Sequence, residues 1–120
     1  NKYKDFNELP IWKTGFGALM KIYDCAVAFP PEEKYSLTSQ IIRSGNSIIA
    51  NIAESHGRYS YQDKARVLYI ARGEIYETRS HLAVALGRKY LTQNIYNTLN
   101  TTYGQLAKEL NLYIKSLLNH

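Results

Sequence analysis

The sequence predicts an all-α fold, an antiparallel up-down-up-down four-helix bundle that forms a single domain over residues 1–120. Apolar residues recur with alternating spacings of four and three along most of the chain, which is the pattern of bundle helices. The sequence shows no sustained period-2 alternation and no asparagine-glycine hairpin turn, so nothing in it predicts a strand. The breaks between helical stretches are short, so successive helices are expected to be antiparallel neighbours.

The first helix is expected from about Leu9 to Phe29, because Pro30 and Pro31 cannot continue it. Its predicted core positions follow the 4-3 spacing and are Trp12, Phe16, Leu19, Tyr23 and Ala26.

The second helix is expected from about Lys34 to His56, with Gly57 as its C-terminal cap. One side of this helix is apolar and belongs in the core: Ile41, Gly45, Ile48, Ile49, Ile52 and Ala53. The opposite side is small and polar: Gln40, Ser44, Ser47, Asn51 and Glu54, with Arg43 and Arg58 at its margin. Such a face lets another helix approach closely or makes a specific polar contact.

The third helix is expected to start at Ser60, because Ser60 and Asp63 are spaced like a capping box, and to end near Gly87. Its predicted core positions are Leu68, Ala71, Ile75, Thr78, Leu82 and Ala85. The fourth helix should run from near Thr92 to the C-terminus, with core positions Ile95, Leu99, Thr102, Leu106, Leu110, Tyr113 and Leu117. Each helical glycine costs about 1 kcal/mol, so we interpret three of them as close-packing points: Gly15, Gly73 and Gly104.

The net charge of +5 is unevenly distributed. Residues 58–89 contain seven basic and three acidic side chains, a net charge of +4, and the rest of the chain carries +1. A basic segment of this kind is typical of nucleic-acid binders, and it is equally typical of a solvated helix face. The candidate phosphate contacts are Arg58, Lys64, Arg66, Arg88 and Lys89.

Two further groups of residues each have two interpretations. Arg72 and Arg79 are seven residues apart and share a helix face at the edge of the apolar stripe. They either pair with a carboxylate, such as Glu54 or an acidic residue of a neighbouring subunit, or face a phosphate backbone. Tyr59 and Tyr61 lie among basic residues and either stack on unpaired bases or fasten the helix start by local packing.

No catalytic or metal-binding motif is present, so we expect a protein without enzymatic activity, metal or cofactor. Glu77 and His81 have a spacing of four, which far more often gives a surface interaction than a metal site. The single cysteine, Cys25, excludes an intrachain disulfide. No apolar run approaches the ~20 residues of a membrane span and no signal peptide is visible, so the predicted location is the cytoplasm, with no membrane contact.

Two short patterns resemble a family of small bacterial four-helix-bundle proteins. The first is Arg43 followed by Asn51-Ile52-Ala53-Glu54, Gly57 and Arg58, and the second is Ile70-Ala71-Arg72-Gly73 followed by Glu77 and Leu82. The family includes the ribosomal-RNA intervening-sequence proteins and the accessory variability proteins of diversity-generating retroelements. The similarity extends from Trp12 to about Leu118.

The resemblance implies a non-enzymatic bundle that assembles into a ring, commonly a pentamer. In the accessory branch it also implies a partner reverse transcriptase and a basic surface for DNA or RNA. Glu74 departs from the family pattern, which often has a small residue there. The polar residues carried over by position are Arg43, Asn51, Glu54, Arg58 and Glu77.

We therefore expect an oligomeric nucleic-acid-binding accessory factor in which a ring repeats the basic segment. The alternative is a structural protein-interaction module with no nucleic-acid binding. In that case a polar interface joins subunits or docks a partner, with contributions from Arg43, Asn51, Glu54, Arg72, Glu77 and Arg79.

Overall fold

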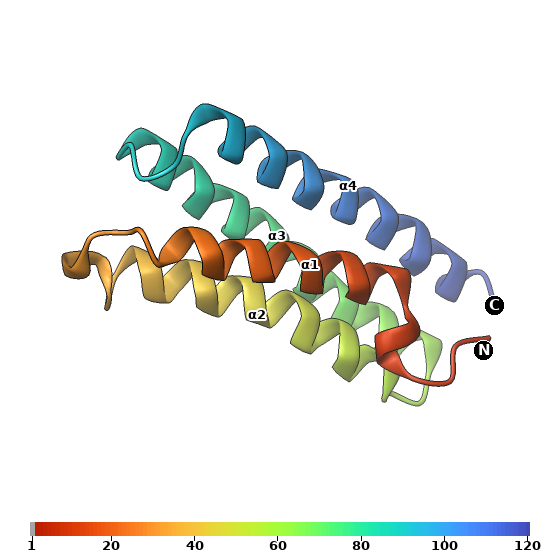
Figure 1. Ribbon diagram of the computed structural model, residues 1–120. Helices are drawn as coiled ribbons and strands as arrows, with labels where there is room; N and C mark the ends of the chain where they lie inside the picture. Colours follow the sequence, from red (N-terminus) through yellow and green to blue (C-terminus); the bar gives the residue numbers. More distant parts are fainter. Residues whose placement is uncertain (1) are drawn as a thin grey trace.

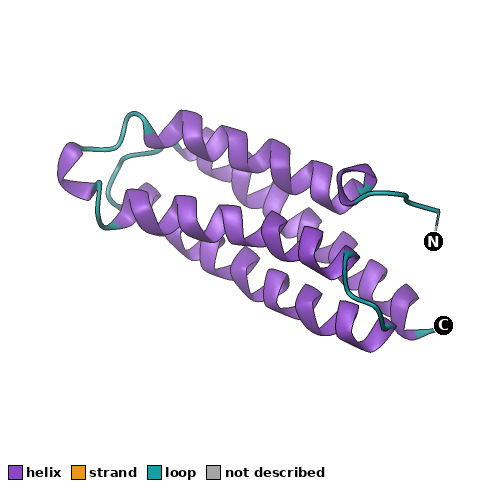
Figure 2. Cartoon of the chain, turned by 90° about the horizontal axis from the view of Figure 1, so that it is seen from below, coloured by secondary structure: helices purple, strands orange, loops and turns teal. Residues whose placement is uncertain are grey.

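The computed structural model describes residues 2–120 and confirms the predicted four-helix bundle. The helices are α1 (Pro10–Ala26), α2 (Leu37–His56), α3 (Tyr61–Gly87) and α4 (Gln93–Leu118), as Figure 1 shows. Two short 3-10 helices, Phe6–Glu8 and Pro31–Glu33, precede α1 and α2. The described part of the chain contains no strand (Figure 2).

Each helix packs against its neighbours in the chain, and α1 closes the bundle against α4. The backbones of the two diagonal pairs of helices do not approach each other closely, as expected for an up-down-up-down order. The contact between α2 and α3 is the most extensive of the four, and the contact between α1 and α4 is the least extensive. Both ends of the chain lie at the same end of the bundle (Figure 1).

Two helices start at or next to the predicted residues, Ser60 and Thr92, and each of these residues caps its helix. Ser60 caps α3 by accepting a hydrogen bond from the backbone N–H of Asp63, and Thr92 caps α4 through Ile95 in the same way. The prediction was wrong at the start of α2, which begins at Leu37 instead of Lys34. The residues after Pro30 form a 3-10 turn there, because the proline pair favours a tight turn before a regular helix can start.

The predicted core of α3 is confirmed, since all six positions are buried. The predicted core of α1 is wrong in part, because Phe16 and Tyr23 are about 40% exposed. Leu19 and Ala26 are buried as predicted, and a series one position earlier supplies the rest of the core: Ile11, Gly15, Ala18 and Ile22. Trp12 and Phe16 stack on each other at the edge of the bundle, with ring centroids 5.1 Å apart.

Two glycines explain why aliphatic rather than aromatic side chains fill the core between α1 and α2. A Cβ atom added at Gly15 would lie 2.6 Å from Ile49 Cγ2, and one added at Gly45 would lie 2.9 Å from Leu19 Cδ1. The backbones of α1 and α2 therefore approach too closely for aromatic rings between them. Gly15 confirms the interpretation as a close-packing point, whereas Gly73 and Gly104 do not, because an added Cβ meets nothing within 4 Å at either position.

The fourth helix buries a different side chain from the one expected. Ile95 is 40% exposed and Thr102 is partly exposed, while Tyr103 is completely buried. The four leucines predicted for the core of α4 are buried: Leu99, Leu106, Leu110 and Leu117. The tyrosine ring is large and mostly apolar, so its burial beside Leu106 outweighs the burial of its hydroxyl.

Candidate nucleic-acid interface

The small polar face of α2 packs against α3 within the same chain. Thr78 donates a hydrogen bond to the Ser44 hydroxyl at 2.7 Å, and Ser47 donates one to Glu74 at 2.9 Å. Asn51 donates to the backbone carbonyl of Ser47 at 2.8 Å. Small side chains allow the close approach of the two helices, and their hydroxyls satisfy each other inside the contact.

An ion-pair cluster continues this contact toward solvent. The Arg43 guanidinium pairs with Glu74, at 3.4 Å, and with Glu77. Glu77 also meets the His81 imidazole at 3.1 Å. Burial and the nearby Arg43 charge lower the pKa of His81, and Glu74 acts in the opposite direction. The predicted interface residues Arg43 and Glu77 are therefore paired with each other across α2 and α3.

Three of the candidate phosphate contacts lie together at the turn between α2 and α3, where they already have partners. Arg58 pairs with Glu54 at 3.4 Å and with Asp63 at 3.3 Å. Arg66 pairs with Asp63 at 2.9 Å, and this hydrogen bond is the largest cause of the lowered pKa of Asp63. Lys64 is part-buried and donates to the backbone carbonyl of His56 at 2.9 Å, and burial lowers the pKa of its amine.

The other two candidates, Arg88 and Lys89, lie at the opposite end of α3. They are 24 or more residues beyond Lys64, a separation of about 36 Å along a helix. Lys89 adopts a left-handed conformation, with a φ of 67°, in the position after the helix end where glycine is most common. The five candidates therefore form two separate groups rather than one surface.

The groove between α3 and α4 brings together cations that have no acidic partner among residues 2–120. Arg72 donates a hydrogen bond to the side-chain oxygen of Asn111 at 2.9 Å, and Arg79 donates one to Asn100 at the same distance. Neither guanidinium pairs with a carboxylate, unlike Arg43, Arg58 and Arg66. Of the two interpretations of Arg72 and Arg79, this arrangement favours an anion outside the chain.

Each of these arginines also covers a tyrosine ring. The Arg72 guanidinium lies 4.7 Å from the centre of the Tyr69 ring, and the Arg79 guanidinium lies 5.4 Å from the centre of the Tyr76 ring. Both rings remain about half exposed, at 44% and 55%. The attraction between a cation and an aromatic face holds the guanidinium groups at the surface of the groove.

Two clefts of about 360 and 400 Å³ share Asn111 and form this groove. Besides the two arginines, Lys115 lines the first and Lys108 lines the second. None of the lining residues is acidic, and Glu109, the only acidic residue of α4, lines a separate cleft beside α1. The α4 residues of the groove were not predicted from the sequence, although Asn100 and Asn111 are spaced for one helix face.

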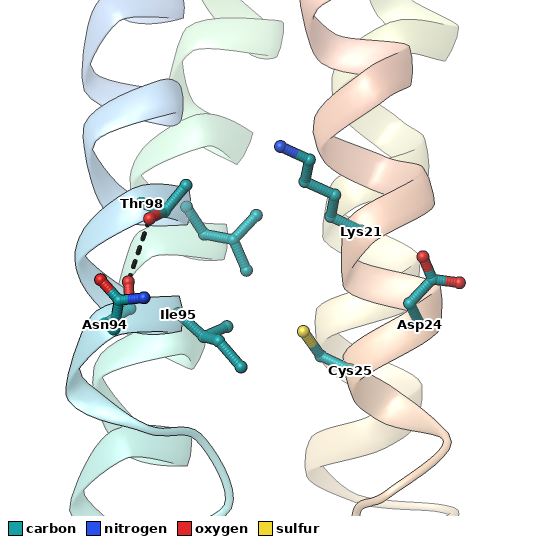
Figure 3. Close-up of a pocket in the computed structure, with 7 residues that line it drawn as sticks. Lys21, Asp24, Cys25, Asn94, Ile95 and Thr98 are labelled. Carbon is teal, nitrogen blue, oxygen red and sulfur yellow. Dashed lines mark hydrogen bonds between the residues drawn. The ribbon is translucent and has the colours of Figure 1, made fainter.

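A smaller cleft of about 240 Å³ lies between α1 and α4 (Figure 3). Cys25 of α1 faces Ile95 of α4 there, with Lys21 and Thr98 at the margin. Burial raises the pKa of the Cys25 thiol, which keeps the less reactive protonated form. This cleft is mostly apolar, with Lys21 and Asp24 as its charged lining residues.

Tyr59 and Tyr61, the tyrosines at the start of α3, behave differently from each other. Tyr61 stacks on His120, at the far end of the sequence, with ring centroids 4.2 Å apart, and Tyr59 is fully exposed. In residues 2–120, no three histidine, cysteine or acidic side chains gather in a way that suits a metal ion. None of the helices in that range is both long and apolar enough to cross a bilayer.

Comparison with known proteins identifies a matching family and solved structures with a similar fold. A family model described as 23S rRNA-intervening sequence protein matches residues 7–112. A crystal structure of a protein with unknown function from the S23 ribosomal protein family of Bacteroides thetaiotaomicron superposes with a TM-score of 0.80. The two sequences are 29% identical, and the match covers 88% of this chain and 98% of the relative. No curated protein matches significantly.

Proposed function

This chain belongs to the 23S rRNA-intervening sequence protein family, and from that premise we propose that it is a non-enzymatic protein that binds nucleic acid in the α3–α4 groove. The observation that carries the proposal is the set of four cations in a groove without carboxylates: Arg72, Arg79, Lys108 and Lys115. Phosphates are the anions that such a track of positive charge recognises, whatever the base sequence.

The two groups of basic residues at the ends of α3 lie beyond the groove and do not line it. Arg66 lies on the same helix as the groove, beyond Arg72, and Arg88 and Lys89 lie beyond Arg79. Because Arg66 shares Asp63 with Arg58, its charge is partly neutralised. We therefore assign the central role to the groove and a supporting role to the residues at its ends.

The family name refers to an intervening sequence of 23S rRNA, which makes RNA the first nucleic acid to test. The experiment is fluorescence anisotropy of labelled RNA at several salt concentrations. Replacing Arg72→Gln and Arg79→Gln together retains an amide that can donate to Asn111 and Asn100 but removes two charges. We expect weaker binding and a salt slope that is smaller by about 1.4, or about 0.7 for each phosphate of a single strand that the variant no longer neutralises.

The matched control removes two charges elsewhere. Lys13→Gln with Lys34→Gln changes the net charge equally, at two exposed positions away from the groove. We expect this control to retain the salt slope of the parent protein. Arg58→Ala with Lys64→Ala should weaken binding less than the groove variant, because both side chains already bond within the chain. If the groove variant and the Lys13 control lose the same affinity, the α3–α4 groove is not the binding surface.

A protein-interaction module is the second candidate, and one observation favours it. The outer face of α3 exposes Ile70 and Val84, each close to half of its surface, with Gly73 between them. An exposed apolar face on a helix is suited to packing against another protein. We propose that this face joins copies of the chain, as the resemblance to ring-forming relatives implies. The resemblance to accessory variability proteins also makes a reverse transcriptase a partner to test.

A further inference from the structure

The α3–α4 groove is built from a repeated unit of three side chains. In the first unit, Arg72 lies over the ring of Tyr69 and donates to Asn111. In the second unit, Arg79 lies over the ring of Tyr76 and donates to Asn100. The tyrosines are seven residues apart on α3, as are the arginines, so the units repeat after two helical turns, or about 10.5 Å.

The partners within each unit leave both a charge and an aromatic ring available. The asparagine oxygen that accepts from each arginine is neutral, so the guanidinium keeps its net charge. Each tyrosine ring has a cation on one side, yet about half of its side chain is exposed to solvent. The attraction between cation and ring positions each guanidinium, and the exposed part of each ring remains available for a further contact.

A single-stranded nucleic acid has the chemistry that complements both parts of the unit. Its bases are free to stack on an exposed aromatic ring, whereas the bases of a duplex are already stacked and paired. Its phosphates can meet the guanidinium beside each ring. A spacing of about 10.5 Å corresponds to roughly three nucleotide steps of a stacked strand at about 3.4 Å each.

We infer that the groove binds single-stranded nucleic acid, with bases stacked on Tyr69 and Tyr76 and neighbouring phosphates held by Arg72 and Arg79. This inference rests on the proposed function and adds the class of nucleic acid and the means of recognition. Because stacking on a ring accepts any base, the binding has little sequence preference.

The test compares a labelled uridine-rich single strand with an RNA hairpin, by anisotropy against the purified chain. Tyr69→Leu with Tyr76→Leu should weaken single-strand binding by about tenfold or more and weaken hairpin binding much less, because the leucines cannot stack on a base. Tyr69→Phe with Tyr76→Phe keeps the rings and should retain the parent affinity. Tyr35→Leu, at an exposed tyrosine far from the groove, is the matched control and should change nothing.

A second measurement uses the parent protein and does not depend on any variant folding. A strand that carries the fluorescent base 2-aminopurine should lose fluorescence on binding, because stacking quenches that base. A DNA strand of the same sequence identifies the ligand further. Equal affinity for the DNA and RNA strands would show that contacts to bases and phosphates are sufficient for binding. Tighter binding of RNA would show that the 2′-hydroxyl makes an additional contact.

Three outcomes would overturn the inference while the proposed function stands: hairpin binding as tight as single-strand binding, no effect of the leucine pair, or loss of affinity in the phenylalanine pair. Unchanged 2-aminopurine fluorescence in a saturated complex would also overturn it. If neither RNA nor DNA binds at low salt, the proposed function itself is wrong.

Discussion

Tyr103 places a polar atom in the centre of the bundle without compensation. Its side chain is fully buried, and its hydroxyl has no hydrogen-bond partner among residues 2–120. Burial raises the pKa of this phenol, so it stays neutral. A buried hydroxyl without a partner costs about 1–3 kcal/mol, which the burial of the ring more than offsets.

Tyr103→Phe should therefore stabilise the protein. Removing only the hydroxyl is expected to raise the free energy of unfolding by about 1 kcal/mol, or the melting temperature by about 4 °C. Thermal and urea unfolding measure both quantities. Tyr59→Phe, at a fully exposed tyrosine, is the control and should have no effect. A less stable Tyr103→Phe variant would mean that the hydroxyl has a partner, such as a buried water.

His81 makes the stability depend on pH in a defined direction. Its pKa in the folded chain is lower than the value of about 6.5 expected when unfolded, because burial and Arg43 oppose protonation. The unfolded chain therefore binds the proton more readily as the pH falls below about 6.5. The stabilisation is present above that pH and is lost as the pH falls toward the folded pKa.

Urea unfolding at about pH 7.5 and about pH 5.5 measures this effect. We expect the parent chain to lose more stability between these values than His81→Gln, which cannot titrate. The charged groups that face the same imidazole are Arg43, Glu74 and Glu77. An equal loss in both proteins would show that His81 is not the group responsible.

At the scale of the helix, the two glycines of α1 have opposite roles although they are two residues apart. Gly15 faces α2, where an added methyl group would meet Ile49 at 2.6 Å. Gly17 faces solvent, where an added Cβ meets nothing within 4 Å. Gly15→Ala should destabilise the bundle by about 1–3 kcal/mol through overpacking, whereas Gly17→Ala should stabilise it by up to about 1 kcal/mol through helix propensity.

The two variants are a matched pair, since each adds one methyl group to the same helix. Thermal unfolding compares them directly. If both stabilise the protein, α1 and α2 can separate without cost and the close approach at Gly15 is not required.

The helices differ in how well their sequences predict the core. The α3 series from Leu68 to Ala85 is a single pattern of mostly aliphatic residues, so the buried face could be assigned. In α1 two series with the same spacing overlap. One contains the aromatic residues Trp12 and Phe16, the other contains the aliphatic residues Ile11 and Ile22, and either could form a core. Choosing between them depends on how close α2 comes, which is a tertiary property.

The candidate site was predictable only along single helices. The basic character of α3 and the shared face of Arg72 and Arg79 follow from the sequence. The partners of these arginines on α4 are 21 and 39 residues away in the chain, so no local pattern connects them. In the same way, the pairing of Arg58 and Arg66 with one shared aspartate depends on the turn geometry between α2 and α3.

At the scale of the whole molecule, self-association remains a prediction. Sizing by multi-angle light scattering should show a homo-oligomer, and the resemblance implies a pentamer. Ile70→Glu with Val84→Glu should reduce the oligomer, because charges would be buried at the proposed α3 contact. Asn51→Leu and Glu54→Ala should also change its size if the polar face of α2 takes part.

Leu112→Glu is the control for this experiment, since Leu112 is 70% exposed on α4 and lies outside the proposed contact. A parent chain that runs as a monomer would contradict self-association through either face. The proposed binding groove lies within one chain, so that result would leave it in place.

The least extensive contact of the bundle, between α1 and α4, has a consequence for how the molecule opens. Local openings start where packing is weakest, so the amide hydrogens of α1 and α4 should exchange with deuterium before those of α2 and α3. A nucleic-acid strand bound between α3 and α4 would hold α4 in place but would not prevent α1 from opening. Hydrogen exchange would then slow in α4 alone. Without nucleic acid α4 would be among the first helices to open, and with nucleic acid it would be among the last.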